Sequence, residues 1–180
     1  MLTPSLDKLA KATDGADIYP LAKHTDLHEV EPHIWLKRED QQDVFSFKIR
    51  GAANRIAGLS TDEKKRGVVC ASAGNHAQGV ALAASAAGIK STIFMPITTP
   101  PIKTEAVTKL GGRIKLVGDN YDGACAAAED FANNTGAVFI HAFDALEVIA
   151  GQGTVGKEIL QDRPNPTRVY VGVGGGGLLS

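Results

Sequence analysis

Short β-like runs alternate with helix-like runs along this chain from about residue 34 onward, and this alternation restricts the fold most strongly. The predicted strands cover residues 34–36, 67–71, 91–95, 113–117, 137–140 and 169–173. The predicted helices cover residues 47–59, 75–88, 102–110, 121–134 and 148–160. Alternation with short links favours parallel sheets with helices on both faces, and therefore an α/β fold.

Ligands of such sheets bind at the carboxyl ends of the strands. The loops that we expect to matter are therefore 41–46, 71–75, 95–101 and 174–177.

Composition excludes several classes of protein. The 180 residues carry 19 Lys and Arg against 20 Asp and Glu, with no basic block, which argues against binding of nucleic acid. No apolar run approaches the roughly 20 residues that span a bilayer, so no membrane contact is expected. The start lacks a signal peptide, and Cys70 and Cys125 lie far apart in apolar segments, as buried thiols do. We therefore expect a cytoplasmic protein, and no ligand spacing predicts a metal site.

Two glycine-rich runs have different interpretations. Gly174–Gly177 follow the last predicted strand, and glycines that open a helix bind phosphate because their N–H groups can approach an anion. A flexible chain end remains an alternative, and a lone G-x-G-x-x-G match at 172–177 is a weak sign of a dinucleotide site. Residues 151–157 nearly spell a nucleotide-binding P-loop, but Glu158 replaces the required Ser or Thr. We interpret 151–157 as a helix that packs closely on its neighbours.

The stretch 72–76 reads Ser-Ala-Gly-Asn-His and lies between a predicted strand and a predicted helix. Free N–H groups at such a helix start suit a carboxylate, while an ordinary capped helix fits equally well. Asn75 is the candidate cap of this helix, and Ser46 is the candidate cap of helix 47–59.

Lys48 lies in the first turn of the predicted helix 47–59. The positive helix end and nearby Arg50 both disfavour its ammonium form, which favours the neutral amine that nucleophilic chemistry needs. Lysine is also the residue that forms Schiff bases with aldehyde cofactors. A solvated surface lysine is the alternative.

These motifs, in this order, resemble the fold-type II pyridoxal-phosphate enzymes (tryptophan synthase beta-like), and among them the threonine dehydratases, or threonine ammonia-lyases. The resemblance covers about residues 18–180. It is carried by segments 36–40, 46–52, 72–79, 118–122, 148–154 and 174–177.

The resemblance implies a role for each matching residue. Lys48 would hold pyridoxal 5′-phosphate covalently, Phe47 would pack beside it, and Asn75 would hydrogen-bond its phenolic oxygen. The phosphate would be bound by Gly174, Gly175, Gly176, Gly177 and Leu178. The substrate carboxylate would be held by Ser72, Ala73, Gly74, Asn75 and His76.

The implied reaction is dehydration and deamination of L-threonine to 2-oxobutanoate and ammonia, with L-serine giving pyruvate as a side reaction. It would serve isoleucine biosynthesis or threonine catabolism, in a homo-oligomer (dimer or tetramer). Ala73 favours elimination because the similar serine racemases carry a serine there as a second acid or base. A serine dehydratase or racemase of the same family remains an alternative.

The family's catalytic unit continues well beyond Ser180, so the resemblance also implies a chain that is incomplete at its C-terminus. Residues 1–52 and 146–180 would belong to a truncated large cofactor-binding domain, and residues 53–145 to a smaller inserted α/β domain. The competing hypothesis is an inactive or partner-dependent fragment, and the isolated chain is expected to be weakly active or inactive.

Overall fold

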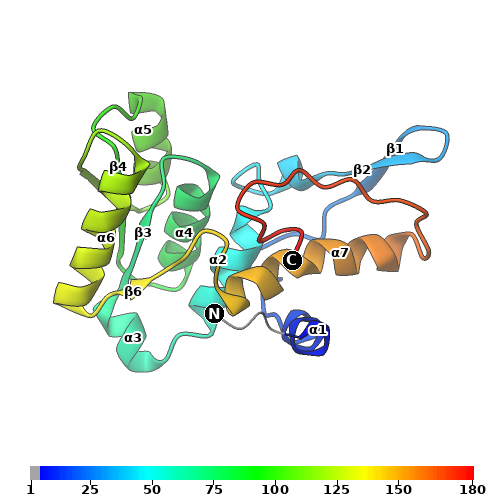
Figure 1. Cartoon of the computed structure of the whole chain (residues 1–180), viewed down its shortest axis with the longest axis horizontal. Coiled ribbons are helices and arrows are strands. Elements are labelled where there is room, and N and C mark those ends of the chain that lie inside the picture. Colours follow the sequence, from blue (N-terminus) through cyan, green and yellow to red (C-terminus); the bar gives the residue numbers. More distant parts are fainter. Residues whose placement is uncertain (1–4) are drawn as a thin grey trace.

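The computed structural model describes residues 5–180, in two lobes with one helix between them (Figure 1). One lobe is built on a parallel sheet of four strands. These are β3 (Val68–Ala71), β4 (Ser91–Met95), β5 (Arg113–Leu116) and β6 (Val138–Phe139). The short helix α3 (Thr61–Arg66) leads into the sheet, and the strands are connected by α4 (Asn75–Ala86), α5 (Pro101–Lys109) and α6 (Tyr121–Thr135).

The other lobe contains helix α1 (Leu6–Asp14), strands β1 (Leu27–Glu31) and β2 (Ile34–Lys37), the 3-10 turn η1 (Glu39–Gln41), and the long helix α7 (Leu146–Asp162). Strands β1 and β2 form an antiparallel hairpin. Helix α2 (Lys48–Ala57) packs against both α4 and α7 and so connects the lobes. None of the helices within residues 5–180 is long and apolar enough to cross a membrane.

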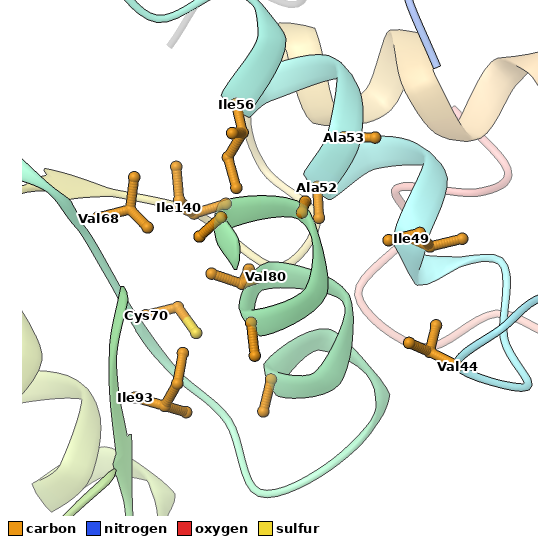
Figure 2. Packing of buried hydrophobic residues seen from close by; sticks show 14 of the residues in the cluster. Val44, Ile49, Ala52, Ala53, Ile56, Val68, Cys70, Val80, Ile93 and Ile140 are labelled. Carbon is orange, nitrogen blue, oxygen red and sulfur yellow. The ribbon is translucent and has the colours of Figure 1, made fainter. Parts of the chain in front are cut away.

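Alternate residues of the strands bury against opposite faces of the sheet. Val68 and Cys70 of β3 point into a cluster that also contains Val80 of α4 and Ile56 of α2 (Figure 2). Their neighbours Val69 and Ala71 pack instead with α6. Because successive strand residues point to opposite faces, four consecutive apolar residues fit a strand that helices cover on both sides. This confirms the predicted α/β class.

The strand order β5-β4-β3-β6 creates a reversal in the sheet. From β3 the chain steps outward to β4 and β5, and α4 and α5 pack on one face. Helix α6 then crosses the opposite face and returns the chain to the far side of β3. The carboxyl ends of β3 and β6 therefore flank a topological switch point, where sheets of this kind bind their ligands.

The glycine-rich run 151–157 lies inside α7, as predicted, and its Gly151 allows close helix packing. A Cβ on Gly151 would lie 2.5 Å from the Arg50 carbonyl oxygen, and a Cβ on Gly51 would lie 2.8 Å from the Val148 carbonyl oxygen. Only residues without a Cβ let α2 and α7 approach so closely. Of the two cysteines predicted to be buried thiols, Cys70 is buried and free, whereas Cys125 is free but partly exposed.

The predicted strand 34–36 is confirmed within β2, but it pairs antiparallel with β1, a strand that was not predicted, and lies outside the parallel sheet. The predicted strand 169–173 was wrong: these residues have no strand pairing, and all but the partly buried Val171 are exposed, with Tyr170 at 85%. The run is β-branched, but a strand also requires a hydrogen-bonded neighbour, and the described residues supply none. Helices α1 and α3 were not predicted, and neither contains a fully buried residue.

Candidate active site

Residues 140–143, which we call the β6 exit, leave the sheet at the switch point and contact three of the predicted site segments. Lys48 Nζ donates a hydrogen bond to the Ala142 carbonyl oxygen at 2.7 Å. The imidazole Nε2 of His76 lies 2.9 Å from the Ile140 carbonyl oxygen. A Cβ on Gly177 would lie 2.7 Å from the Phe143 carbonyl oxygen, so the glycine-rich loop packs against the same segment.

Lys48 is the first residue of α2 and is partly buried. Its backbone N–H donates to Ser46 Oγ at 3.3 Å, but the N-cap of α2 is Phe47 and not Ser46, so the prediction of Ser46 as the cap was wrong. Burial lowers the pKa of the Lys48 ammonium, because a charged group loses hydration inside the protein. The Phe47 ring centroid lies 5.4 Å from Nζ. The expected direction of the pKa change is therefore confirmed.

Arg50 does not cause that change, contrary to the prediction. Its guanidinium is fully buried and donates at 2.6 and 2.8 Å to the two carboxylate oxygens of Glu158 on α7. It also donates to both carboxylate oxygens of Glu39, at 2.7 Å each. Burial acts to lower the pKa of Arg50, but these two carboxylates outweigh it and raise the pKa. The charge of Arg50 is thus neutralised locally.

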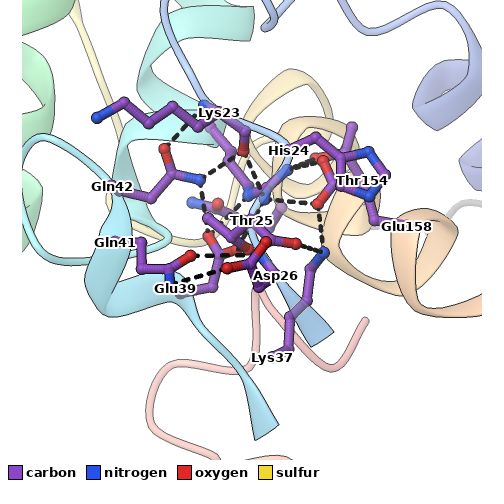
Figure 3. Close-up of polar contacts among 12 residues, drawn as sticks. Lys23, His24, Thr25, Asp26, Lys37, Glu39, Gln41, Gln42, Thr154 and Glu158 are labelled. Carbon is purple, nitrogen blue, oxygen red and sulfur yellow. Dashed lines mark hydrogen bonds and ion pairs between the residues drawn. The ribbon is translucent and has the colours of Figure 1, made fainter. Parts of the chain in front are cut away.

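The polar network around Arg50 ties the N-terminal segment and the hairpin to α7 (Figure 3). Lys37 of β2 pairs with Glu158 at 2.7 Å, and Thr25 donates to Glu39 at 2.6 Å. Gln42, in the loop before α2, bonds the backbone of Lys23 in both directions. This network fixes the start of α2 and so fixes the backbone that carries Lys48.

The second predicted segment lies at the N-terminus of α4. Gly74, not Asn75, is the capping position, and within the described residues no side chain caps this helix end. Asn75 is the first helical residue and is exposed, so its amide is available to a ligand. Ser72 Oγ accepts the Gly74 N–H at 3.2 Å, and Ala73 is partly buried. The N–H groups at this helix end, with no acidic residue in the first turn, suit an anion.

His76 differs from its neighbours because its imidazole turns into the core and is only 4% exposed. Burial lowers its pKa to about 4, and the nearby Lys48 and His141 act in the same direction, against the hydrogen bond to Ile140, which raises it. The ring is therefore neutral at physiological pH. Only the backbone N–H of His76 can serve the predicted anion site.

The glycine-rich loop has an inner and an outer side. Gly177 is buried, and a Cβ on Gly175 would collide with the Phe143 ring. Around Gly174 and Gly176 there is open space, and Gly176 has a φ of +88°, which side chains rarely adopt. Leu178 is partly buried in the turn that follows.

Sequence reasoning missed the β6 exit as a functional segment. It is short, and its contacts with Lys48 and His76 use only backbone carbonyl oxygens. Its place after a strand was visible in the sequence, but its importance depends on the strand order. The loop 95–101, in contrast, follows β4, which does not border the switch point.

Comparisons with known proteins agree with this arrangement. The family model described as "Pyridoxal-phosphate dependent enzyme" matches residues 13–180. The biosynthetic threonine dehydratase 1 of Solanum lycopersicum is 51% identical over 173 residues, which are 95% of this chain and 28% of that protein. The L-threonine ammonia-lyase of Thermotoga maritima is 55% identical over 147 residues, 82% of this chain and 37% of that protein.

Solved structures show the same fold. The processed threonine deaminase isoform 2 of Solanum lycopersicum superposes with a TM-score of 0.93 at 41% identity, over 98% of this chain and 51% of that one. Maize serine racemase gives 0.90 at 33% identity, over 99% and 56%. The chain thus spans about half of these two solved relatives, and 28% and 37% of the two curated ones. Because this family model matches residues 13–180, nearly the whole chain, the chain belongs to the pyridoxal-phosphate dependent enzymes.

Proposed function

We propose that this chain forms the lysine-bearing part of a threonine ammonia-lyase that uses pyridoxal 5′-phosphate. One observation carries the proposal: the Lys48 amine, with its pKa lowered by burial, donates to Ala142 at the switch point of the sheet. The names of the tomato and Thermotoga relatives support threonine as the substrate.

The residues present fit the cofactor. Gly174 and Gly176 leave open space where other residues would carry a Cβ, as a phosphate-binding loop requires. Gly175, Gly177 and Leu178 would complete that loop, Phe47 and Asn75 would contact the cofactor ring, and Lys48 would hold the cofactor through its aldehyde. When bound, pyridoxal phosphate supplies an aldehyde that condenses with amines and a ring that takes up the electron pair released at Cα.

The chain's own groups supply binding and proton transfer. The N–H groups from Ser72 to His76 bind the threonine carboxylate at the positive end of α4. Lys48, as a free amine, removes the proton from Cα, because its lowered pKa favours the unprotonated form. The Cβ hydroxyl gains one proton, which balances the proton taken from Cα, and leaves as water. Water is regained when the released enamine hydrolyses to 2-oxobutanoate and ammonia. Ala73 carries no proton for the opposite face of Cα, which disfavours racemisation.

Two alternatives lie close to this proposal. The similarity to maize serine racemase keeps serine dehydration or racemisation as the second candidate, with Ala73 as the residue that argues against it. An inactive or partner-dependent fragment is the third, because the chain spans only part of each relative. A homo-oligomer and a cytoplasmic location stay predictions, and the tomato relative is named as chloroplastic.

The test is to add pyridoxal phosphate to the purified chain, record its absorbance, and reduce it with borohydride before peptide mapping. We expect an absorbance band near the visible edge and a reduced pyridoxyl group on Lys48. Lys48→Ala should lose both, whereas Lys109→Ala, at an exposed helical position, should keep both. A label on another lysine, or a band that survives Lys48→Ala, would refute the assignment.

The substrate is tested separately by measuring 2-oxobutanoate from L-threonine and pyruvate from L-serine. We expect threonine to be preferred and no D-serine to accumulate. If cofactor binds Lys48 and serine is racemised, the second candidate replaces the first. If cofactor binds without turnover of either amino acid, the fragment hypothesis holds.

A further inference from the structure

The β6 exit is held from two sides, and one of the contacts comes from a side chain that the proposed reaction leaves unused. His76 Nε2 lies 2.9 Å from the Ile140 oxygen, and Lys48 Nζ donates to the Ala142 oxygen at 2.7 Å. The two carbonyls belong to residues two apart in one short segment. Loss of the His76 contact with Ile140 would therefore leave the Ala142 carbonyl, which holds Lys48, freer to move.

The protonation of His76 follows from its partners. A carbonyl oxygen only accepts, so Nε2 must carry the proton. Nδ1 is buried and has no hydrogen-bond partner among the described residues, so a second proton there would be an unpaired N–H in the core. The neutral Nε2–H tautomer satisfies both observations, and the low pKa of the ring agrees with it.

We propose that His76 is a positioning residue for the Lys48 amine and acts through the carbonyls of Ile140 and Ala142. The inference rests on the proposed function of Lys48. An amine that takes a proton from Cα must direct its lone pair at that proton, and an N–H held by Ala142 fixes one direction around Nζ. His76 thereby links the start of α4, where the carboxylate would bind, to the group that would perform the chemistry.

Three variants separate positioning from a merely structural role. His76→Gln keeps a side-chain N–H that can reach Ile140, and His76→Leu fills the space without a donor. Val80→Ala removes buried methyl groups from the same helix and the same core cluster as Ile140, but removes neither hydrogen bond to the β6 exit. Val80→Ala therefore controls for loss of stability alone.

The measurement is competitive acylation of the lysines with acetic anhydride over a range of pH, without pyridoxal phosphate, read by peptide mass spectrometry. It gives the limiting rate for the Lys48 amine relative to the exposed Lys109. We expect His76→Leu to raise the relative rate about threefold to tenfold, the range that one lost hydrogen bond corresponds to. His76→Gln and Val80→Ala should stay near the parent value.

Nitrogen-15 NMR of the imidazole provides the second readout. We expect the Nε2–H tautomer in the parent chain. The proposal is overturned if the proton sits on Nδ1, if His76→Leu leaves the Lys48 rate unchanged, or if Val80→Ala raises it equally. Because no cofactor is used, these results are independent of whether pyridoxal phosphate binds. If the cofactor binds Lys48 but the acylation rate of Lys48 is the same in His76→Leu and the parent, this inference is wrong and the proposed function is unaffected.

Discussion

At the scale of single residues, the effect of burial on a charged group depends on whether a group of opposite charge is buried with it. Lys48 and His76 lose hydration with only backbone carbonyls as partners, so their neutral forms are favoured. Arg50 and Glu158 are fully buried together and stay charged, because each neutralises the other. Lys48, with its lowered pKa, thus lies two residues from Arg50 and its charged network.

The neutral state of His76 makes stability depend on pH. The pKa of the ring falls from 6.5 in an unfolded chain to about 4 in the folded protein, so the unfolded chain binds the extra proton first. This contribution is complete above pH 6.5 and is lost as the pH falls toward 4. We expect about 2 kcal/mol of unfolding free energy to disappear between pH 7 and pH 5. Urea titrations of the parent and His76→Gln should differ in this slope; equal slopes would contradict the assignment.

The buried ion pair predicts a large mutational effect. Burial raises the pKa of Glu158, but hydrogen bonds from Arg50 and Lys37 outweigh it, so the net pKa is lowered. Glu158→Gln leaves the buried guanidinium without one of its two carboxylates, and we expect a loss of about 3 kcal/mol. The control is Asp62→Asn, which breaks an exposed pair with Lys65 and should cost less than about 1 kcal/mol. Similar losses in both, by chemical denaturation, would show that the network contributes little.

At the scale of elements, the crossing of α2 and α7 sets where Lys48 lies relative to the sheet. Gly51 and Gly151 face each other across it, and a Cβ on either would meet backbone atoms of the opposite helix. In the motif that resembles a P-loop, packing therefore explains Gly151, while Gly156 faces open space. Nearby, the polar network adds directional contacts between the same two helices.

Substitution of these glycines tests the crossing. Gly151→Ala places a Cβ 2.5 Å from the Arg50 carbonyl, so the helices must separate, and we expect a loss of about 2 kcal/mol or more. Gly156→Ala is the matched control on the same helix, because open space surrounds it. It should gain about 0.5–1 kcal/mol through helix propensity. Thermal unfolding of both distinguishes packing from propensity, and a tolerated Gly151→Ala would show that the helices can separate freely.

At the scale of the whole molecule, the sheet and the last part of the chain differ in their backbone hydrogen bonding. Strand β3 has hydrogen-bonded neighbours on both sides and is buried on both faces. Residues 169–173 have the composition of a strand, but no backbone hydrogen bond joins them to the rest of the described chain.

Hydrogen exchange should reveal this difference. We expect amides of β3 and β4 to exchange only through global unfolding, and amides of 169–173 to exchange at nearly the rate of an open chain. Exchange followed by mass spectrometry on peptic peptides resolves the two regions. Strong protection of 169–173 would mean that this segment pairs with something, such as a second copy of the chain, and the concentration dependence of the protection would identify self-association.

Local pattern was enough to predict the α/β class, the main helices and the place of 151–157 inside a helix that packs closely at Gly151. The roles of Lys48 and of the two loops stay predictions. These features depend on nearest neighbours along the chain: apolar periodicity, glycines that follow strands, and a lysine at a helix start. The resemblance added the cofactor and the substrate class, both of which concern a longer protein than this chain.

Only the tertiary structure decided which loops meet. Parallel strands do not carry their order in their own sequence, so the pairing of β3 with β6, and with it the switch point, could not be read from the residues. The same holds for Arg50, whose charge was expected to act on Lys48 but is neutralised by Glu39 and Glu158, 11 and 108 positions away. The physical reason is that hydrogen bonds and desolvation depend on distance in space, and the return of the chain by α6 determines that distance at the β6 exit.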